Sequence, residues 1–239
     1  MGIMGRMGLM GPMRFIVTAG PTREHLDDVR FLTNASSGRM GYAVARAAAQ
    51  RGHSVDLIAG PVALPDPPGV RIHRATSTRE MCEAAKKLFP RADCLIGAAA
   101  PADFTPVRRI KGKAKKTESS LVLQLKPTPD ILATLGRAKR RQVIIAFALE
   151  VRSPLKNARL KLRRKNADAI VLNSPSAIGA LRSDATILLR SGSSLEVKQA
   201  TKRRLGRILV ALAESLRASN FHHDGRESSP RRHDEHDER

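Results

Sequence analysis

The sequence is poor in aromatic residues and in cysteine. Of its 239 residues 41% are hydrophobic, but only 3% are aromatic and none is Trp. The core must therefore be built mostly from Ala, Val, Leu and Ile, and its small side chains let helices lie close to a sheet. Cys82 and Cys94 are too few for a disulfide framework, and neither belongs to a CxxC pair. This cysteine usage fits a reducing cytoplasm.

The N-terminus lacks the features of a secretory signal and of a membrane-spanning helix. Residues 1–13 are dominated by Met and Gly, without a continuous apolar core or a cleavage site. We therefore expect a disordered leader over residues 1–13 and a cytoplasmic protein without a membrane partner. Residues 218–239 have almost no apolar side chains, which predicts a disordered charged tail. Residues 14–217 between them are long enough for one domain.

Acidic residues are also few, since 22 Asp and Glu stand against 43 Lys and Arg, and the formal net charge is +21. Such a charge invites a nucleic-acid partner. However, the basic blocks are not interleaved with aromatic side chains, and no zinc knuckle or RNA-binding signature is present. A small polyanionic ligand and solvated helix faces explain the blocks at least as well, so nucleic acid is an unlikely partner. The blocks lie at residues 108–116, 137–141, 156–165 and 198–207.

Short apolar runs and helix signals alternate through the expected domain. Residues 14–18 predict a first strand, and the Ala-rich residues 42–51 predict a helix ended by Gly52. This alternation is typical of an α/β fold whose mostly parallel sheet is covered on both faces. Further strands are expected at 54–59, 70–74, 93–99, 121–125, 142–148 and 167–172, a hairpin at 185–190 and 195–198, and helices at 78–89, from 129–130 onward, at 156–166 and at 201–216.

The loop between the first strand and the first helix is unusually long. It runs over residues 18–41, whereas a strand-to-helix connection normally takes a few residues, so we interpret it as a binding segment. Its end, Ser-Ser-Gly-Arg-Met-Gly at 36–41, combines hydroxyls, a cation and a helix N-terminus, which together favour phosphate.

Ligands in open parallel sheets bind at the carboxyl ends of the strands. The loops after Thr18, Ala99 and Phe147 all leave that edge, so they should meet at one crevice. A further stretch after Ala99 has no apolar period and ends in the basic block 108–116, which we interpret as a mobile flap.

Several separated motifs follow one another in order through residues 14–217. They are Thr-Ala-Gly-Pro-Thr-Arg at 18–23, Val-Arg-Phe-Leu-Thr-Asn at 29–34, the 36–41 segment, Ala-Ala-Ala-Pro-Ala-Asp-Phe at 98–104, Lys-Ala-Lys-Lys at 113–116, Thr-Pro-Asp-Ile-Leu at 128–132, Ala-Phe-Ala-Leu-Glu at 146–150 and Lys-Leu-Arg-Arg-Lys-Asn-Ala-Asp at 161–168. In order and spacing they resemble the phosphopantothenoylcysteine synthetase family, the ligase step of coenzyme A biosynthesis.

The resemblance implies a Rossmann-like three-layer αβα fold, a homodimer and a ligase reaction in two steps. In the first step the carboxylate of 4′-phosphopantothenate attacks the α-phosphate of CTP, and pyrophosphate leaves. In the second step the amine of cysteine displaces CMP from the acyl-cytidylate. Mg²⁺ and protein cations are expected, because the first step gathers a phosphorylated carboxylate and a triphosphate.

Many bacterial relatives carry an upstream flavin-dependent decarboxylase domain. The 13 residues before the first strand leave no room for it, so we expect a stand-alone ligase without FMN. Four residues depart from those usual in the family: Arg39, Pro101, Leu149 and Ser174. Use of ATP instead of CTP therefore stays open, as do a relative that has lost its activity and a nucleic-acid-binding protein with this fold.

Two residues acquire catalytic roles through the resemblance. The Asn34 amide would donate a hydrogen bond to the developing oxyanion, worth roughly 3 kcal/mol in comparable sites. The flap residue Lys113 would bind the nucleotide and close over the hydrolysable intermediate. No metal ligands follow from the motifs.

The other implied contacts fall into two groups. The acid substrate would be held by Arg30, Ser36, Ser37, Gly38, Arg39, Met40 and Gly41. The nucleotide would be bordered by Gly97, Ala98, Ala99, Asp103, Lys113, Pro129, Asp130, Ile131, Leu132, Phe147, Lys161 and Lys165. Small side chains at 97–99 would allow close approach of a ribose or base, and Lys161 and Lys165 lie on one face of a helix.

Overall fold

A single large sheet forms the centre of the protein. The computed structural model describes residues 11–115, 121–174 and 179–224, without the side chains of 221–224. The strands of the central sheet are β1 (Arg14–Ala19), β4 (Ser54–Ala59), β5 (Arg71–Arg74), β6 (Cys94–Gly97), β9 (Val143–Leu149), β10 (Ala169–Asn173), β11 (Arg182–Leu189) and β12 (Ser194–Thr201). Their order is β12-β11-β10-β9-β6-β1-β4-β5. The pairs from β10 to β5 are parallel, and only β10/β11 and β11/β12 are antiparallel, which confirms the predicted α/β fold.

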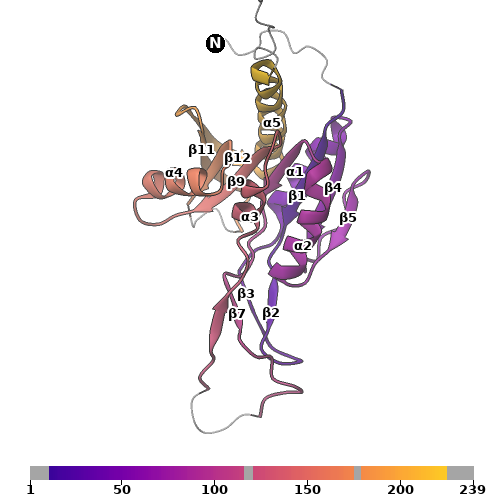
Figure 1. Cartoon of the computed structure of the whole chain (residues 1–239), viewed down its shortest axis with the longest axis vertical. Coiled ribbons are helices and arrows are strands. Elements are labelled where there is room, and N and C mark those ends of the chain that lie inside the picture. Colours follow the sequence, from indigo (N-terminus) through magenta and orange to yellow (C-terminus); the bar gives the residue numbers. More distant parts are fainter. Residues whose placement is uncertain (1–10, 116–120, 175–178, 225–239) are drawn as a thin grey trace, which may run out of the picture.

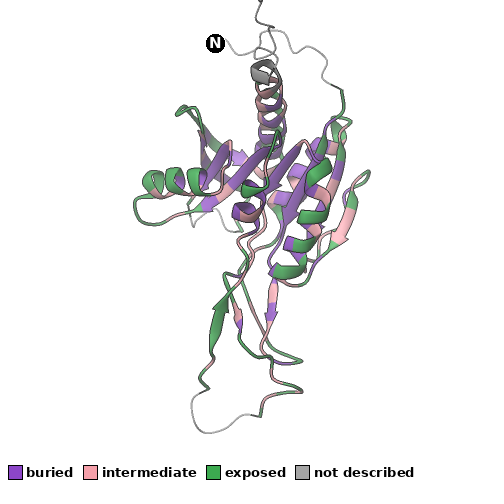
Figure 2. Ribbon diagram, viewed as in Figure 1, coloured by how far each residue is buried: buried purple, intermediate pink, exposed green. Residues whose placement is uncertain are grey.

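Helices cover both faces of this sheet (Figure 1). Helices α1 (Arg39–Gln50) and α5 (Lys202–Asp224) pack on one face. Helices α2 (Thr78–Leu88), α3 (Ile131–Arg137) and α4 (Pro154–Arg164) pack on the other, with a 3₁₀ turn, η1 (Phe89–Arg91), after α2. Figure 2 shows buried strands between helices whose outer faces are exposed. The three layers agree with the Rossmann-like architecture implied by the resemblance.

Small residues let these layers approach closely, as the composition predicts. A Cβ atom on Gly41 of α1 would lie 2.4 Å from the Cβ of Ala19 in β1. A Cβ atom on Gly206 of α5 would lie 2.9 Å from the carbonyl oxygen of Ala43. Any larger side chain at these two positions would push a helix away from its neighbour.

An arm of two short antiparallel pairs projects from the sheet (Figure 1). One pair joins β2 (Arg23–His25) to β3 (Phe31–Thr33), and the other joins β7 (Phe104–Pro106) to β8 (Leu125–Pro127). We did not predict β2, β3 or β7, because three-residue strands have too little periodicity to detect. The strand expected at 121–125 is also wrong: residues 121–124 form no strand, and β8 begins at Leu125.

The basic stretch that we interpret as a mobile flap, residues 108–116, lies along the arm. Backbone hydrogen bonds join this stretch to the β2–β3 turn, from Ile110 N–H to the Leu26 carbonyl (2.8 Å) and from Asp28 N–H to the Gly112 carbonyl (3.2 Å). The described part of the stretch is therefore one wall of the arm, and Lys116 lies outside the described residues.

The domain is slightly longer at both ends than the predicted range 14–217. Met13 is 3% exposed, and its N–H donates to Nδ1 of His53 (3.2 Å). Helix α5 continues to Asp224, although residues 218–224 were expected in the tail. The remaining leader residues 1–10 and tail residues 225–239 lie outside the described part of the chain.

The structure also bears on the expectations about cysteine and membranes. Cys82 and Cys94 are both free and buried. Burial raises the pKa of each thiol, so neither is prepared to act as a nucleophile. Within residues 11–115, 121–174 and 179–224, no helix combines the length and the apolar character needed to cross a membrane.

Candidate active site

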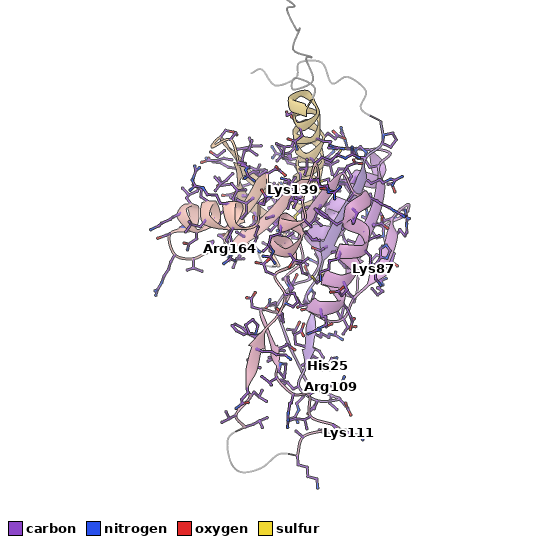
Figure 3. The ribbon with its side chains drawn as sticks, viewed as in Figure 1. His25, Lys87, Arg109, Lys111, Lys139 and Arg164 are labelled. Atoms are coloured by element: carbon purple, nitrogen blue, oxygen red, sulfur yellow. The ribbon has the colours of Figure 1, made fainter. Side chains whose placement is uncertain are left out.

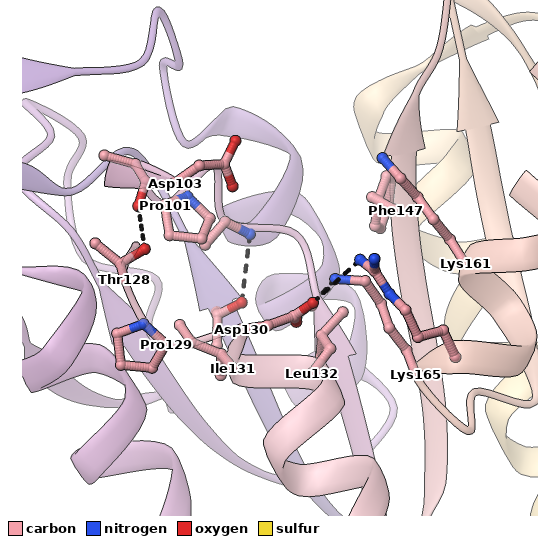
Figure 4. Close-up of a pocket in the computed structure, with 15 residues that line it drawn as sticks. Pro101, Asp103, Thr128, Pro129, Asp130, Ile131, Leu132, Phe147, Lys161 and Lys165 are labelled. Carbon is pink, nitrogen blue, oxygen red and sulfur yellow. Dashed lines mark hydrogen bonds and ion pairs between the residues drawn. The ribbon is translucent and has the colours of Figure 1, made fainter. Parts of the chain in front are cut away.

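A cleft opens at the carboxyl edge of the parallel strands (Figure 4). The cleft has a volume of about 230 Å³ and is open to solvent on one side. Strands β1, β6 and β9, the loop after β6, the start of α3 and the end of α4 all contribute to it. The lining residues are Thr18, Gly97, Ala99, Pro101, Ala102, Asp103, Thr128, Pro129, Asp130, Ile131, Leu132, Phe147, Lys161, Arg164 and Lys165.

This lining includes every residue predicted to border the nucleotide except Ala98 and Lys113. Strands β1 and β9 each contribute one residue, Thr18 and Phe147, and the loop after β6 contributes four, whereas no described residue of the loops after β1 and β9 lines the cleft. Five lining residues were not among the predicted contacts: Thr18, Pro101, Ala102, Thr128 and Arg164. Each lies inside one of the motifs, so inclusion of whole motifs would have found them.

Gly97 lines the cleft and also has a packing role. A Cβ atom there would lie 2.7 Å from Cδ2 of Leu132, so the space above Gly97 is filled by the leucine at the start of α3. Gly97 thus lets α3 approach the sheet, and Leu132 forms the surface that a ligand meets. Among residues 97–99, Gly97 and Ala99 line the cleft, whereas Ala98 does not.

Three threonines from distant segments hold one peptide of the cleft. The Ala102 N–H donates to Oγ1 of Thr22 (2.9 Å), and its carbonyl accepts from Oγ1 of Thr128 (2.6 Å) and of Thr78 (3.2 Å). The Oγ1 atoms of Thr22 and Thr78 are 2.8 Å apart. Because Thr78 donates to the carbonyl, Thr22 must donate to Thr78, so every hydroxyl proton has a determined position. This network fixes the backbone just before Asp103, and Figure 4 shows the part of it that Thr128 makes.

Asp130 connects the two helices that face each other across the cleft. Its Oδ1 caps α3 by accepting from the Ala133 N–H (3.0 Å) and also accepts from Nζ of Lys165 (2.9 Å). Desolvation by burial acts to raise the pKa of Asp130, but the Ala133 N–H and the Lys165 ammonium outweigh it, so the pKa is lowered. Asp130 is therefore ionised and holds Lys165 at the cleft wall.

Lys161 has an acidic partner too. Its Nζ lies 2.6 Å from Oε1 of Glu150, whose side chain is 12% exposed. The amide of Asn157 donates to the other oxygen of Glu150 (3.3 Å). The two lysines predicted to supply positive charge are thus paired already, Lys161 with Glu150 and Lys165 with Asp130.

Asn34 lies beside the cleft at the end of β3. Its Nδ2 donates to the carbonyls of Pro101 (2.9 Å) and Ala100 (3.3 Å). The amide therefore joins the arm to the loop after β6, and a ligand carbonyl would have to replace one of these acceptors.

The segment 36–41 forms a second hollow. Ser36, Ser37 and Arg39 line it together with residues 61–64 after β4. Helix α1 is capped by Gly38, which has a φ of 73° and no side-chain cap, so neither serine acts as the N-cap. Met40 and Gly41 face the core instead of this hollow.

Two predicted site residues, Arg30 and Lys113, lie on the arm. The Arg30 guanidinium donates to Oδ2 of Asp27 (2.6 Å) and to the Ala114 carbonyl (2.7 Å). The Arg30 side chain, together with N–H groups of the arm, holds the pKa of Asp27 well below its usual range. Lys113 is exposed between Gly112 and Ala114, which are bound to Asp28 and Asp27. Neither cation lines the cleft or the second hollow.

Comparison with known proteins places the chain in a family. Residues 10–216 match the family described as DNA/pantothenate metabolism flavoprotein C-terminal domain. The chain is similar to the coenzyme A biosynthesis bifunctional protein CoaBC of Bacillus subtilis, with 46% identity over 166 residues, 69% of this chain and 41% of the relative. It is 39% identical over 219 residues to CoaBC of Mycobacterium tuberculosis, covering 85% of this chain and 52% of the relative.

The chain thus spans about half the length of these curated relatives. A crystal structure of the C-terminal domain of CoaBC superimposes with a TM-score of 0.75 and 36% identity, covering 87% of this chain and 96% of that domain. A structure titled DNA/pantothenate metabolism flavoprotein from Streptococcus pneumoniae gives a TM-score of 0.76 at 26% identity, covering 85% of this chain and 99% of that one. This protein therefore belongs to the family of DNA/pantothenate metabolism flavoprotein C-terminal domains.

Proposed function

We propose that this protein is a phosphopantothenate–cysteine ligase that uses CTP. The observation that carries the proposal is the cleft, which gathers all but two of the residues expected around a nucleotide. The family membership supports the same reaction, because relatives over this region are named coenzyme A biosynthesis proteins.

In the first step, a carboxylate oxygen of 4′-phosphopantothenate forms a bond to the α-phosphorus of CTP. The bond to the bridging oxygen breaks, and pyrophosphate leaves with its electron pair. Lys161, Arg164 and Lys165 line the cleft and would offset the charge of the departing group. Within the described residues, no group of three or more His, Cys, Asp or Glu is placed to hold a metal ion. Mg²⁺ in nucleotide sites is commonly bound through substrate phosphates, and we propose the same here.

In the second step, the amine of cysteine attacks the acyl carbon. An amide bond forms, CMP leaves with the electron pair of the broken bond, and the amine releases a proton. Asn34 would move its amide from the Pro101 carbonyl to the acyl oxygen as charge develops there. Neither step changes an oxidation state, so the proposed reaction requires no FMN.

We also propose a homodimer that forms through the arm. Large apolar side chains are exposed there, more than a lone surface hairpin would be expected to show. They are Val29 (57%), Phe104 (52%), Val107 (45%), Leu121 (61%), Val122 (84%) and Leu125 (43%). A second copy is the partner that would bury them.

The dimer would also explain the position of Lys113. Figure 3 shows Arg109 and Lys111, two neighbours of this residue, at the far end of the arm, away from Arg164 beside α4. Because Asp27 and Asp28 anchor residues 112 and 114, Lys113 cannot swing to the cleft of its own chain without breaking these bonds. We therefore propose that Lys113 serves the cleft of the partner chain.

The ligase proposal is tested by following pyrophosphate release. The purified protein is mixed with Mg²⁺, 4′-phosphopantothenate and either CTP or ATP. We expect release with CTP that requires phosphopantothenate, followed by CMP when cysteine is added. Faster release with ATP would show that ATP, and not CTP, is the co-substrate. No release with either nucleotide would refute the ligase, and oligonucleotide binding that is salt-sensitive and survives Asn34→Ala would favour the nucleic-acid alternative.

A further inference from the structure

Three cations reach the cleft from the end of α4, and they differ in how far an acid already neutralises them. Lys161 lies 2.6 Å from Glu150, and Lys165 lies 2.9 Å from Asp130. Within the described part of the chain, Arg164 has a single contact to an acid, at 3.5 Å from Nη2 to Oδ2 of Asp130. At that distance the hydrogen bond is at the limit of a useful interaction.

The exposed fractions agree with this difference. The side chain of Lys165 is 16% exposed and that of Lys161 is 39% exposed, whereas that of Arg164 is 68% exposed. Arg164 nevertheless lines the cleft. Figure 3 shows it beside α4, at the edge of the molecule's main body. Most of its guanidinium donors are therefore available to a ligand.

The chemistry of the two kinds of cation also differs. A guanidinium offers five N–H donors in a planar fork that matches two oxygens of a phosphate, and it stays charged at any relevant pH. The lysines can bind a phosphate only by sharing or leaving the carboxylates that hold them. The cleft also has apolar lining at Ile131, Leu132 and Phe147, which suits a base or ribose better than phosphate.

We propose that Arg164 is the principal ligand of the polyphosphate in this cleft. Lys161 and Lys165 line the cleft in fixed positions, and the charge of each is partly neutralised by its carboxylate partner. The inference deepens the proposed function, on which the choice of a nucleoside triphosphate rests. The contacts that the resemblance implies include Lys161 and Lys165 of this helix but not Arg164.

The test compares ligands that differ only in the number of phosphates. CTP, CDP and CMP are titrated with Mg²⁺ into the native protein, Arg164→Gln and Arg163→Gln. Arg163 is the matched control, because it is the same residue type, adjacent and exposed, but does not line the cleft. Arg164→Gln is expected to weaken CTP roughly tenfold or more, as for loss of a charged hydrogen bond, and CMP less than about twofold. Arg163→Gln should leave all three unchanged.

Inorganic triphosphate serves as a second probe, because it tests the polyphosphate role without a nucleoside. We expect it to bind the native protein and Arg163→Gln and to bind Arg164→Gln roughly tenfold more weakly. Equal losses for CTP and CMP, or no change in triphosphate binding, would overturn the role of Arg164 even if pyrophosphate release shows the ligase to be active. Loss of triphosphate binding only in Arg164→Gln would support the role even if the co-substrate proves not to be CTP.

Discussion

The cleft and the arm contain residues of the same motifs, but they are built in opposite ways. The cleft lies on the rigid edge of a parallel sheet, and its polar groups are fixed by the threonines around Ala102 and by the Asp130 cap of α3. The arm has no core of its own and is held together at Asp27 and Asp28. The cleft thus forms within one chain, whereas the arm exposes apolar side chains and presents Lys113 away from it. Motifs that belong to one family therefore need not lie in one place in one chain.

The largest expected effects come from one substitution in the arm and one beside the cleft. Lys113→Gln and Asn34→Asp should each lower turnover about 100-fold or more, in line with the loss of a charge-stabilising donor. If Lys113 serves the partner, a mixed dimer of the two variants has one intact site. Unfolding and refolding the variants together should then restore about a quarter of native activity, because half of random dimers are mixed. Steady-state pyrophosphate release measures this.

The same mixture has a clear contrary outcome. If Lys113 acts in its own chain, every site in a mixed dimer carries one defect, and activity should stay at the level of the single variants. Native protein refolded alone is the control for recovery.

A second change should loosen the arm and spare the cleft. Asp27→Ala removes the acceptor for Arg30 and for the N–H groups of Val29, Arg30 and Ala114. We expect faster amide hydrogen exchange at these three residues with little change at Ala133 in α3. Equal exchange at all four amides before and after the substitution would show that the arm is held in another way.

The ionisation of Asp27 also predicts how hydrogen-exchange protection of the arm depends on pH. A group whose pKa is depressed in the folded state stabilises the fold above its unfolded pKa and loses that effect only as the pH falls through the folded value. The pKa of Asp27 lies well below its usual range, because Arg30 binds the carboxylate. Protection of the arm should therefore persist as the pH falls through about 4, where an ordinary aspartate is half protonated.

The threonine network around Ala102 can be tested at Thr78. Thr78→Val deletes a fully buried hydroxyl and leaves the Thr22 hydroxyl without its acceptor. The free energy of unfolding should fall by about 1–3 kcal/mol. If the network positions Asp103, the KM for the nucleotide should also rise, and Thr78→Ser should recover both quantities. A loss of stability with an unchanged KM would limit Thr78 to a structural role.

The smallest expected effect concerns Glu150. Glu150→Gln keeps the size of the side chain but releases Lys161 from its ion pair. The freed ammonium should bind CTP somewhat more tightly, by about threefold or less for a partly exposed charge. Turnover should fall by a similar factor, because Lys161 loses its fixed position. Weaker CTP binding would mean that Glu150 is needed to keep Lys161 in the cleft.

Expectations from local signals were accurate for the parallel strands of the central sheet. The runs that became β1, β4, β9 and β10 are apolar, and β1, β6 and β9 all line the cleft because parallel strands share one carboxyl edge. Local signals failed where the structure depends on distant pairs. Arg30 and Ala114 are 84 positions apart, and no local pattern around either residue predicts their contact.

The sequence by itself determined the α/β class, the family and about two thirds of the cleft lining, because strand periodicity and motifs can be read directly from the chain. Only the tertiary structure decided how charge is distributed there. Glu150 and Asp130 pair with Lys161 and Lys165 because helix α4 packs against β9 and the start of α3, and this packing leaves Arg164 with its donors largely available. The arm is decided at the same level, since its three-residue strands are stable only when distant segments bring their backbones together.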